Sequence, residues 1–375
     1  MANNNKHTGP NVPALRFPEF SGEWKTKTML EIAPLQRGFD LPKGNIRPGD
    51  IPVVYSNGIM STHNQSKCIG PGVITGRSGT IGSFTFIPNG PYWPHNTALW
   101  VTNFCGNVPL FIYHLYSHIG IVRFASGSGV PTLNRNDVHK HITSIPSNLR
   151  EQNKIASFLS LLDDRIEIQS KIIEELTTLR SALIEKCAKQ SGNFFPLSDI
   201  LKEVEERSTT ANQYQVLSST VKGIFSQKEY FNKDIASEDN KGYKVVRKGH
   251  IVLSPQNLWM GNINYNDRFD IGIVSPSYKV FSIKEGFNPI FIAALLQTKK
   301  ALNEYMLASE QGASIVRRNL NIEAFMAIKF WIPDARQQDS LSMAITAINA
   351  KLNNERCYLE QLSMQKSCLL ENMFI

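Results

Sequence analysis

Two long stretches of the chain, residues 147–190 and 334–375, repeat apolar residues at alternating spacings of three and four positions. This spacing lines up apolar side chains along one face of a helix, as in a coiled coil. Neither stretch contains proline, so each is expected to form one uninterrupted helix of about 60 Å. The apolar positions of the two patterns are Ile155, Leu159, Leu162, Ile166, Ile173, Leu176 and Leu183, and Leu341, Ile345, Ile348, Leu352, Leu359, Leu362 and Leu369.

The two stretches also share their polar interruptions. A shift of 186 residues superimposes all seven apolar and all three polar positions. The polar positions are Gln152, Gln169 and Arg180 in the first stretch, and Gln338, Glu355 and Lys366 in the second. Unrelated amphipathic helices would not share such exceptions, so we predict a duplicated coiled-coil helix whose polar positions fix register or partner. The pattern leaves open whether the helices run parallel or antiparallel.

The remaining segments, 1–146 and 191–333, read as mixed α and β. Glycine and proline separate short β-type runs, such as 72–75 and 250–253, which are expected strands. Helices are expected at 110–118 and 289–307.

Each of these segments also closes in the same way. Neighbouring Asn and Arg residues, Asn134 with Arg135 and Arg318 with Asn319, precede a β-run that ends in Ile-Pro. The whole half is therefore duplicated. We predict an α+β protein with a pseudo-twofold internal repeat: two mixed α/β domains (1–146 and 191–333) and two long helices (147–190 and 334–375).

Composition narrows the class of protein. Of 375 residues, 42% are hydrophobic and 19% charged, which excludes a disordered or fibrous chain. No apolar run approaches the ~18 residues of a membrane helix, and the polar start predicts no signal peptide. Five scattered cysteines form no Cys-x-x-Cys pair, which predicts reduced thiols in the cytoplasm and no metal site.

Positive charge is concentrated in the first half. The net charge is +8, and residues 1–150 hold 13 Lys and Arg against 6 Asp and Glu. Residues 191–334 hold 17 against 15. Such an excess permits a nucleic-acid partner, whereas the balanced helices are typical of protein-contacting elements.

Motifs for catalysis are missing. The sequence contains no Walker loop, no His-Glu-x-x-His and no Gly-x-Ser-x-Gly elbow. The nearest approach to the Asp/Asn-Pro-Pro-aromatic motif of DNA amino-methyltransferases is Ser275-Pro276-Ser277-Tyr278, with two defining positions wrong. The Asp-x-Lys spacing at Asp239 to Lys241 lies in a polar segment typical of an exposed loop. No catalytic residue is therefore assigned.

The chain resembles the specificity subunit of type I restriction-modification systems over nearly its whole length. The resemblance is carried by the opening Leu15-Arg16-Phe17-Pro18-Glu19-Phe20 with Ser21-Gly22-Glu23-Trp24, by the turn Gly76-Arg77-Ser78-Gly79-Thr80-Ile81-Gly82, and by Ile145-Pro146 with Gln152 and Ile155. The half-length duplication adds to these motifs.

The resemblance implies a division of labour. Two target recognition domains each read half of a split double-stranded DNA target, and an antiparallel coiled coil sets the half-site spacing. Two modification subunits carrying S-adenosylmethionine chemistry dock on this scaffold, and restriction subunits add ATP- and magnesium-dependent translocation and cleavage. This chain would itself be non-catalytic and hold no cofactor.

Candidate DNA-contacting residues lie in expected turns and loops and carry side chains suited to base edges or phosphates. Asn and Gln pair with adenine and Arg with guanine, while Lys and Arg bind phosphates. The candidates are Lys67, Arg77, Ser78, His95, Asn96, Lys222, Gln256, Asn257, Arg317 and Arg318. Two alternatives stay open: a self-sufficient DNA adenine methyltransferase with degenerate motifs, and a coiled-coil scaffold without a DNA role.

Overall fold

A computed structural model describes residues 11–127, 131–187, 192–231, 240–311 and 318–375. The chain divides into two compact units, which are described separately. The first unit comprises Met1–Ser170 and Cys357–Ile375, and the second comprises Lys171–Arg356. Each unit therefore combines one globular part with portions of the two long helices, α4 (Leu149–Cys187) and α10 (Ala335–Met373).

The first unit contains two four-stranded sheets. The antiparallel sheet has the order β2 (Leu35–Arg37), β9 (Ala98–Val101), β6 (Gly72–Gly76), β7 (Phe84–Ile87). The other has the order β4 (Gly58–His63), β3 (Ile51–Tyr55), β8 (Pro91–Pro94), β5 (Cys68–Ile69), with β3 and β8 parallel. Two strand pairs flank them: β1 (Lys25–Thr28) with β12 (Ile142–Ile145), and β10 (Ala125–Ser126) with β11 (Thr132–Leu133).

In the first unit, α2 (Pro109–Ile119) packs on β6 and β7 of the antiparallel sheet, and α3 (Arg135–His139) contacts β2. The other helical elements of this unit are α1 (Met29–Ile32) and the short 3-10 turns η1 (Lys43–Asn45) and η2 (Ile121–Phe124). Phe111 and Leu115 of α2 belong to one apolar core with Leu159 of α4 and Phe374, which follows α10. The long helices are therefore part of the globular core at this point.

Residues 16–24, here called the opening strap, are held on α4 by side-chain contacts. Arg16 forms two hydrogen bonds to Glu151, of 2.7 and 2.9 Å, and Trp24 Nε1 donates a third at 3.2 Å. The Glu151 side chain is only 2% exposed and that of Arg16 15%. Phe17 packs edge-on against Phe158, with ring centroids 5.8 Å apart. The opening motif thus has a structural role in the first unit.

The second unit has the same sheet at its centre. The order is β14 (Leu201–Glu203), β21 (Lys279–Ile283), β18 (Ile251–Leu253), β19 (Ile263–Tyr265). The remaining pairs are β13 (Gly192–Pro196) with β24 (Lys329–Pro333), β15 (Leu217–Thr220) with β16 (Gly223–Ser226), β17 (Lys244–Arg247) with β20 (Ile271–Val274), and β22 (Ser309–Gln311) with β23 (Arg318–Leu320). The helices are α5 (Leu197–Ile200), α6 (Gln227–Phe231), η3 (Leu258–Met260), α7 (Pro289–Leu295), α8 (Lys299–Leu307) and α9 (Ile322–Ala327).

The predicted duplication and α+β class are confirmed. Both antiparallel sheets place their strands in the same order, and in both units a strand pair closes the globular part just before the long helix. The matching helix caps are Asn134 before α3 and Asn321 before α9, so Asn134 corresponds to Asn321 rather than to Asn319. The single helix expected over 289–307 is two helices, because the Thr298 hydroxyl caps a new start at α8.

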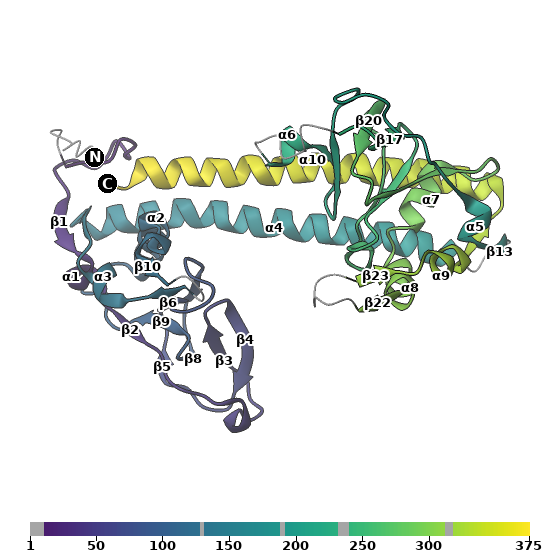
Figure 1. The fold of residues 1–375 in the computed structure, drawn as a ribbon. Coiled ribbons are helices and arrows are strands. Elements are labelled where there is room, and N and C mark those ends of the chain that lie inside the picture. Colours follow the sequence, from purple (N-terminus) through teal and green to yellow (C-terminus); the bar gives the residue numbers. More distant parts are fainter. Residues whose placement is uncertain (1–10, 128–130, 188–191, 232–239, 312–317) are drawn as a thin grey trace. The chain divides into compact units, whose positions relative to one another are not determined.

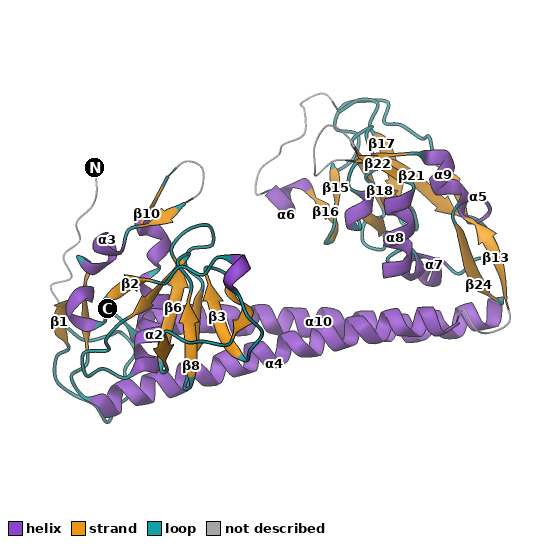
Figure 2. Ribbon diagram, turned by 90° about the horizontal axis from the view of Figure 1, so that it is seen from below, coloured by secondary structure: helices purple, strands orange, loops and turns teal. Residues whose placement is uncertain are grey.

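The two long helices run antiparallel within each unit (Figures 1 and 2). In the first unit, Lys366 bonds Asp163, and Arg165 donates to the Tyr358 hydroxyl at 2.7 Å. In the second unit, Arg180 donates to Asn349 at 3.1 Å, and Ile184 shares a core with Ile345. In each pairing, advancing along α4 means moving back along α10. The antiparallel coiled coil implied by the family resemblance is therefore present in the fold.

None of the fourteen apolar heptad residues is exposed. Ile155, Leu159, Leu162, Ile345, Leu352 and Leu362 are buried. Ile166, Ile173, Leu176, Leu183, Leu341, Ile348, Leu359 and Leu369 are half-buried.

Gln152 and Gln338, at polar heptad positions, form hydrogen bonds with the globular parts, a role that the heptad pattern did not predict. The Gln152 amide accepts from the N–H of Val108, the residue before α2, and donates to the Pro146 carbonyl and to Asn107. Gln338 accepts from the N–H of Asn288, the residue before α7, and donates to the Pro333 carbonyl. Both side chains are buried. These glutamines fasten each long helix to the globular part that precedes it.

Among the described residues, no helix is both long and apolar enough to cross a membrane.

Candidate nucleic-acid interface

Arg77 and Ser78 lie in a tight loop directly after β6. A Cβ at Gly76 would stand 1.6 Å from the Thr80 carbonyl oxygen, so only glycine allows this turn. The N–H groups of Arg77 and Ser78 donate to the Thr97 carbonyl at 2.8 and 3.3 Å. These bonds fix the loop beside the segment that follows β8.

His95 and Asn96 occupy that neighbouring segment. The His95 ring lies 4.2 Å from the Tyr55 ring, and its Nδ1 is 3.0 Å from the Thr97 hydroxyl. Partial burial lowers the pKa of His95, despite the opposing influence of the Leu41 backbone and Asp40. The Asn96 carbonyl accepts from Arg77 Nη1 at 3.4 Å. The lowered pKa of His95 favours its neutral imidazole, which offers one donor and one acceptor.

Lys67 completes the cluster in the first unit. Its ammonium lies 5.1 Å from the Trp93 ring and 5.8 Å from the Phe39 ring, both within cation–π range. Phe39 forms a bridge with His95, so Lys67 is joined through Phe39 to the same segment. The first unit thus brings together all five candidates from this half, although up to 29 positions separate them in the sequence.

The second unit places Gln256, Asn257 and Arg318 together. Gln256 and Asn257 follow β18, and the Gln256 carbonyl accepts from the Arg318 N–H at 3.2 Å. The Arg318 guanidinium donates to the Ser309 carbonyl at 2.8 Å. Part of the Arg318 side chain is therefore committed to the fold. Arg317 lies outside the described residues.

Lys222 stands exposed at the turn between β15 and β16. A buried amide network holds this turn. Asn264 donates to the Ser219 hydroxyl and to the Thr220 carbonyl, each at 2.8 Å. Asn262 accepts from the Ser219 hydroxyl at 2.8 Å and donates to the Ser219 carbonyl at 2.9 Å. Because Asn262 N–H also donates to the Asn257 carbonyl at 3.3 Å, the network links the Lys222 turn to the Gln256 loop.

The candidate loops occupy equivalent places in the two units. In the first, the Leu133 N–H donates to the Arg77 carbonyl at 2.7 Å, and in the second, the Arg318 N–H donates to the Gln256 carbonyl. Each bond joins the loop after a central strand to the chain leading into α3 or α9. Sequence reasoning missed the amides of Asn262 and Asn264, whose Asn-x-Asn spacing marks one face of a strand.

The motifs that approached catalytic patterns have structural roles or lie outside the described residues. The Tyr278 N–H donates to the Ser275 carbonyl at 3.0 Å, and its hydroxyl donates to the Ser219 carbonyl at 3.2 Å, as in a packed turn. Asp239 lies outside the described residues, and its neighbour Asn240 is buried and bonded to Asn212. Within the part of the chain that the structure covers, no cluster of three or more His, Cys, Asp or Glu could hold a metal.

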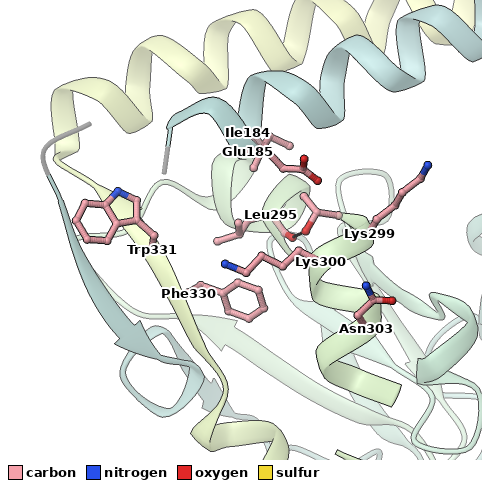
Figure 3. A pocket seen from close by; sticks show the side chains of 9 residues that line it. Ile184, Glu185, Leu295, Lys299, Lys300, Asn303, Phe330 and Trp331 are labelled. Atoms are coloured by element: carbon pink, nitrogen blue, oxygen red, sulfur yellow. Dashed lines mark hydrogen bonds between the residues drawn. The ribbon is translucent and has the colours of Figure 1, made fainter. Parts of the chain in front are cut away.

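One cavity of about 420 Å³ lies in the second unit (Figure 3). Its walls are mostly apolar, from Ile184, Leu295, Phe330 and Trp331. Lys299, Lys300 and Glu185 add both signs of charge, together with Thr298 and Asn303. None of the candidate DNA-contacting residues that the structure describes lines this cavity.

Residues 21–178 match the family model described as "Type I restriction modification DNA specificity domain". The matched part of the chain is therefore similar to that family, and it comprises the Arg77 loop, the His95 segment and most of α4. The resemblance to type I specificity subunits inferred from the sequence is confirmed.

A solved structure supports the same fold over the whole chain. The type I restriction-modification S subunit from M. genitalium aligns over 97% of this chain and 99% of its own, at 17% identity and a TM-score of 0.59. An S subunit from Thermoanaerobacter tengcongensis covers 94% at 14% identity, with a TM-score of 0.34. A third structure, described as the structural basis of complex assembly and conformational transition of the type I R-M system, aligns over 93% of this chain at 13% identity, with a TM-score of 0.48. No curated protein matches the chain.

Proposed function

We propose that this chain is the non-catalytic DNA specificity subunit of a type I restriction-modification complex. Each globular part reads one half of a bipartite double-stranded DNA target, and the antiparallel helices set the half-site spacing. The observation that carries the proposal is the equivalent placement of the Arg77 and Gln256 loops. Two loops of one scaffold with different side chains suit two different half-sites.

Affinity and specificity would come from different residues. Lys67 and Lys222 are exposed and would bind phosphates without regard to sequence. Amides and guanidinium groups such as Asn96, Gln256 and Arg77 would discriminate bases in the major groove. Methyl transfer needs S-adenosylmethionine, and translocation needs ATP and magnesium. We assign these cofactors to the modification and restriction subunits.

The test is sequencing of adenine methylation in the source cell, with and without this gene. We expect deletion to erase one bipartite motif, and re-introduction to restore it with the same half-sites and spacing. Purified without partners, the chain should transfer no methyl group. A methylome that does not change, in a cell shown to contain the assembled complex, would overturn the assignment. Methylation by the isolated chain would instead favour a self-sufficient methyltransferase.

The outer face of α4 supports docking of the modification subunits. Leu161 and Ile168 lie one heptad apart and are 62% and 57% exposed, although both are large and apolar. Because successive residues of a helix are rotated by about 100°, Leu161 and Ile168 face away from the side of α4 formed by the buried Leu159 and Leu162. An apolar stripe at heptad spacing suits the apolar face of a partner helix.

Leu161→Glu is expected to weaken capture of the modification subunit at least about tenfold, because it places a charge in an apolar contact. Co-purification and analytical ultracentrifugation would measure this, with the unfolding midpoint nearly unchanged. Ser170→Glu is the matched control, since Ser170 is exposed on nearly the opposite side of the same helix. Equal effects of the two variants would exclude this stripe as the docking surface.

A further inference from the structure

Asp40 lies beside the candidate reading segment of the first unit, although the sequence pattern did not single it out. The chain from Gly38 to Asp40 runs against the segment after β8. The Phe39 N–H donates to the Pro94 carbonyl at 2.8 Å, and the Gly38 N–H donates to the Ala98 carbonyl at 3.0 Å. A Cβ at Gly38 would meet the His95 carbonyl oxygen at 2.3 Å, so only glycine permits this approach. The position of Asp40 is therefore fixed by backbone contacts.

The Asp40 carboxylate engages the side chain of Asn96. Asn96 Nδ2 donates to Asp40 Oδ1, and Arg37 Nη2 lies 3.4 Å from the same oxygen. Both members of the Arg37–Asp40 pair are strongly exposed, at 52% and 71%. Exposed ion pairs contribute only ~0–1 kcal/mol to stability. Stability alone therefore gives little reason for this carboxylate.

The carboxylate also stands among positive charges. Arg77 donates to the Asn96 carbonyl, and Lys67 packs on Phe39, the residue before Asp40. On a surface that binds phosphates, a negative charge lowers affinity. A carboxylate would nevertheless accept a hydrogen bond from a base amino group in the major groove, and it would repel the O6 or O4 acceptors of guanine and thymine. The Asp40 carboxylate would therefore lower the affinity for DNA and increase the discrimination between bases.

We infer that Asp40 is a specificity-determining residue, which orients the Asn96 amide and selects a base carrying an amino group, adenine or cytosine, at one position of the half-site read by the first globular part. With one Nδ2 hydrogen held by Asp40, the Asn96 oxygen and second N–H stay available as an acceptor–donor pair. Bidentate recognition of adenine requires that pair. This inference rests on the proposed function.

The experiment uses the assembled modification complex carrying Asp40→Asn, which keeps the shape of the side chain but adds a donor. Methylome sequencing and methylation of duplexes with single base-pair changes would read the outcome. We expect one position of one half-site to accept guanine or thymine, with discrimination falling roughly ten- to hundredfold. The other half-site and the spacing should stay unchanged.

Two further variants separate the explanations. Asp50→Asn removes the same charge from an exposed position in the same globular part and should leave every motif position unchanged. Asn96→Ala should relax the same base pair as Asp40→Asn. A motif unaltered by Asp40→Asn, or relaxation by the two variants at different positions, would overturn the inference. Absence of any bipartite motif with the unaltered gene would instead overturn the proposed function.

Discussion

Replacing Arg16 by methionine is expected to lower the free energy of unfolding of the first unit by about 3–5 kcal/mol. The change leaves the Glu151 carboxylate buried, and among the described residues Trp24 Nε1 is then its remaining side-chain donor. A buried charge without its partner keeps its desolvation cost and loses the compensating attraction. Urea unfolding would measure the loss, and hydrogen exchange would show earlier opening at the start of α4.

Two further variants test whether the buried Glu151 charge causes this loss of stability. The double variant Arg16→Met with Glu151→Gln should recover much of the loss, because a neutral amide is cheaper to bury. The second half already carries Gln337 at the position equivalent to Glu151. The control is Arg247→Met, which breaks the exposed Arg247–Glu206 pair and should cost under about 1 kcal/mol. Similar losses from Arg16→Met and Arg247→Met would show that the strap does not stabilise the first unit.

Inserting one heptad into both long helices is expected to abolish methylation at the original motif. Seven residues preserve the apolar face of each helix and lengthen it by about 10 Å, close to three base pairs of B-DNA. Three base pairs also rotate a half-site by roughly 100° around the duplex. Under the proposed function, the complex should therefore lose its original target and act weakly on a spacer about three base pairs longer.

Methylome sequencing of cells carrying the lengthened chain would measure this outcome. The comparison is a four-residue insertion near Gln169 in α4 alone, which rotates the following apolar residues by about 40° and shifts their pairing with α10 by about 6 Å. It should disrupt assembly or alter the spacing. The original spacing, retained by an intact complex with the added heptads, would contradict the idea that the helices set the half-site distance.

The long helices were predictable because their signal is periodic. Residues such as Leu159 and Ile345 lie at heptad positions, and burial of a face requires that spacing whatever the neighbours are. The roles of Gln152 and Gln338 were not predictable. Their partners are backbone groups near residues 108 and 288. The sequence does not show which backbone N–H will need a side-chain acceptor in the folded chain.

The candidate interface was predictable only in part. Turn chemistry led to the Arg77 and Gln256 loops, since glycine and polar residues follow short apolar runs there. Asp40 was missed because it meets Asn96 across 56 positions of sequence, through a sheet whose strand order no local pattern gives. The individual contacts of the candidates with DNA stay a prediction.

The glutamine anchors also bear on how such a chain tolerates mutation. Gln152 and Gln338 share two contacts, the N–H before α2 or α7 and the carbonyl of Pro146 or Pro333. Backbone groups persist when side chains are replaced. The surface loops of either globular part can therefore change in sequence while the globular part stays attached to the long helix. Under the proposed function, new DNA targets would then be accessible by substitution in the loops without rebuilding the rest of the molecule.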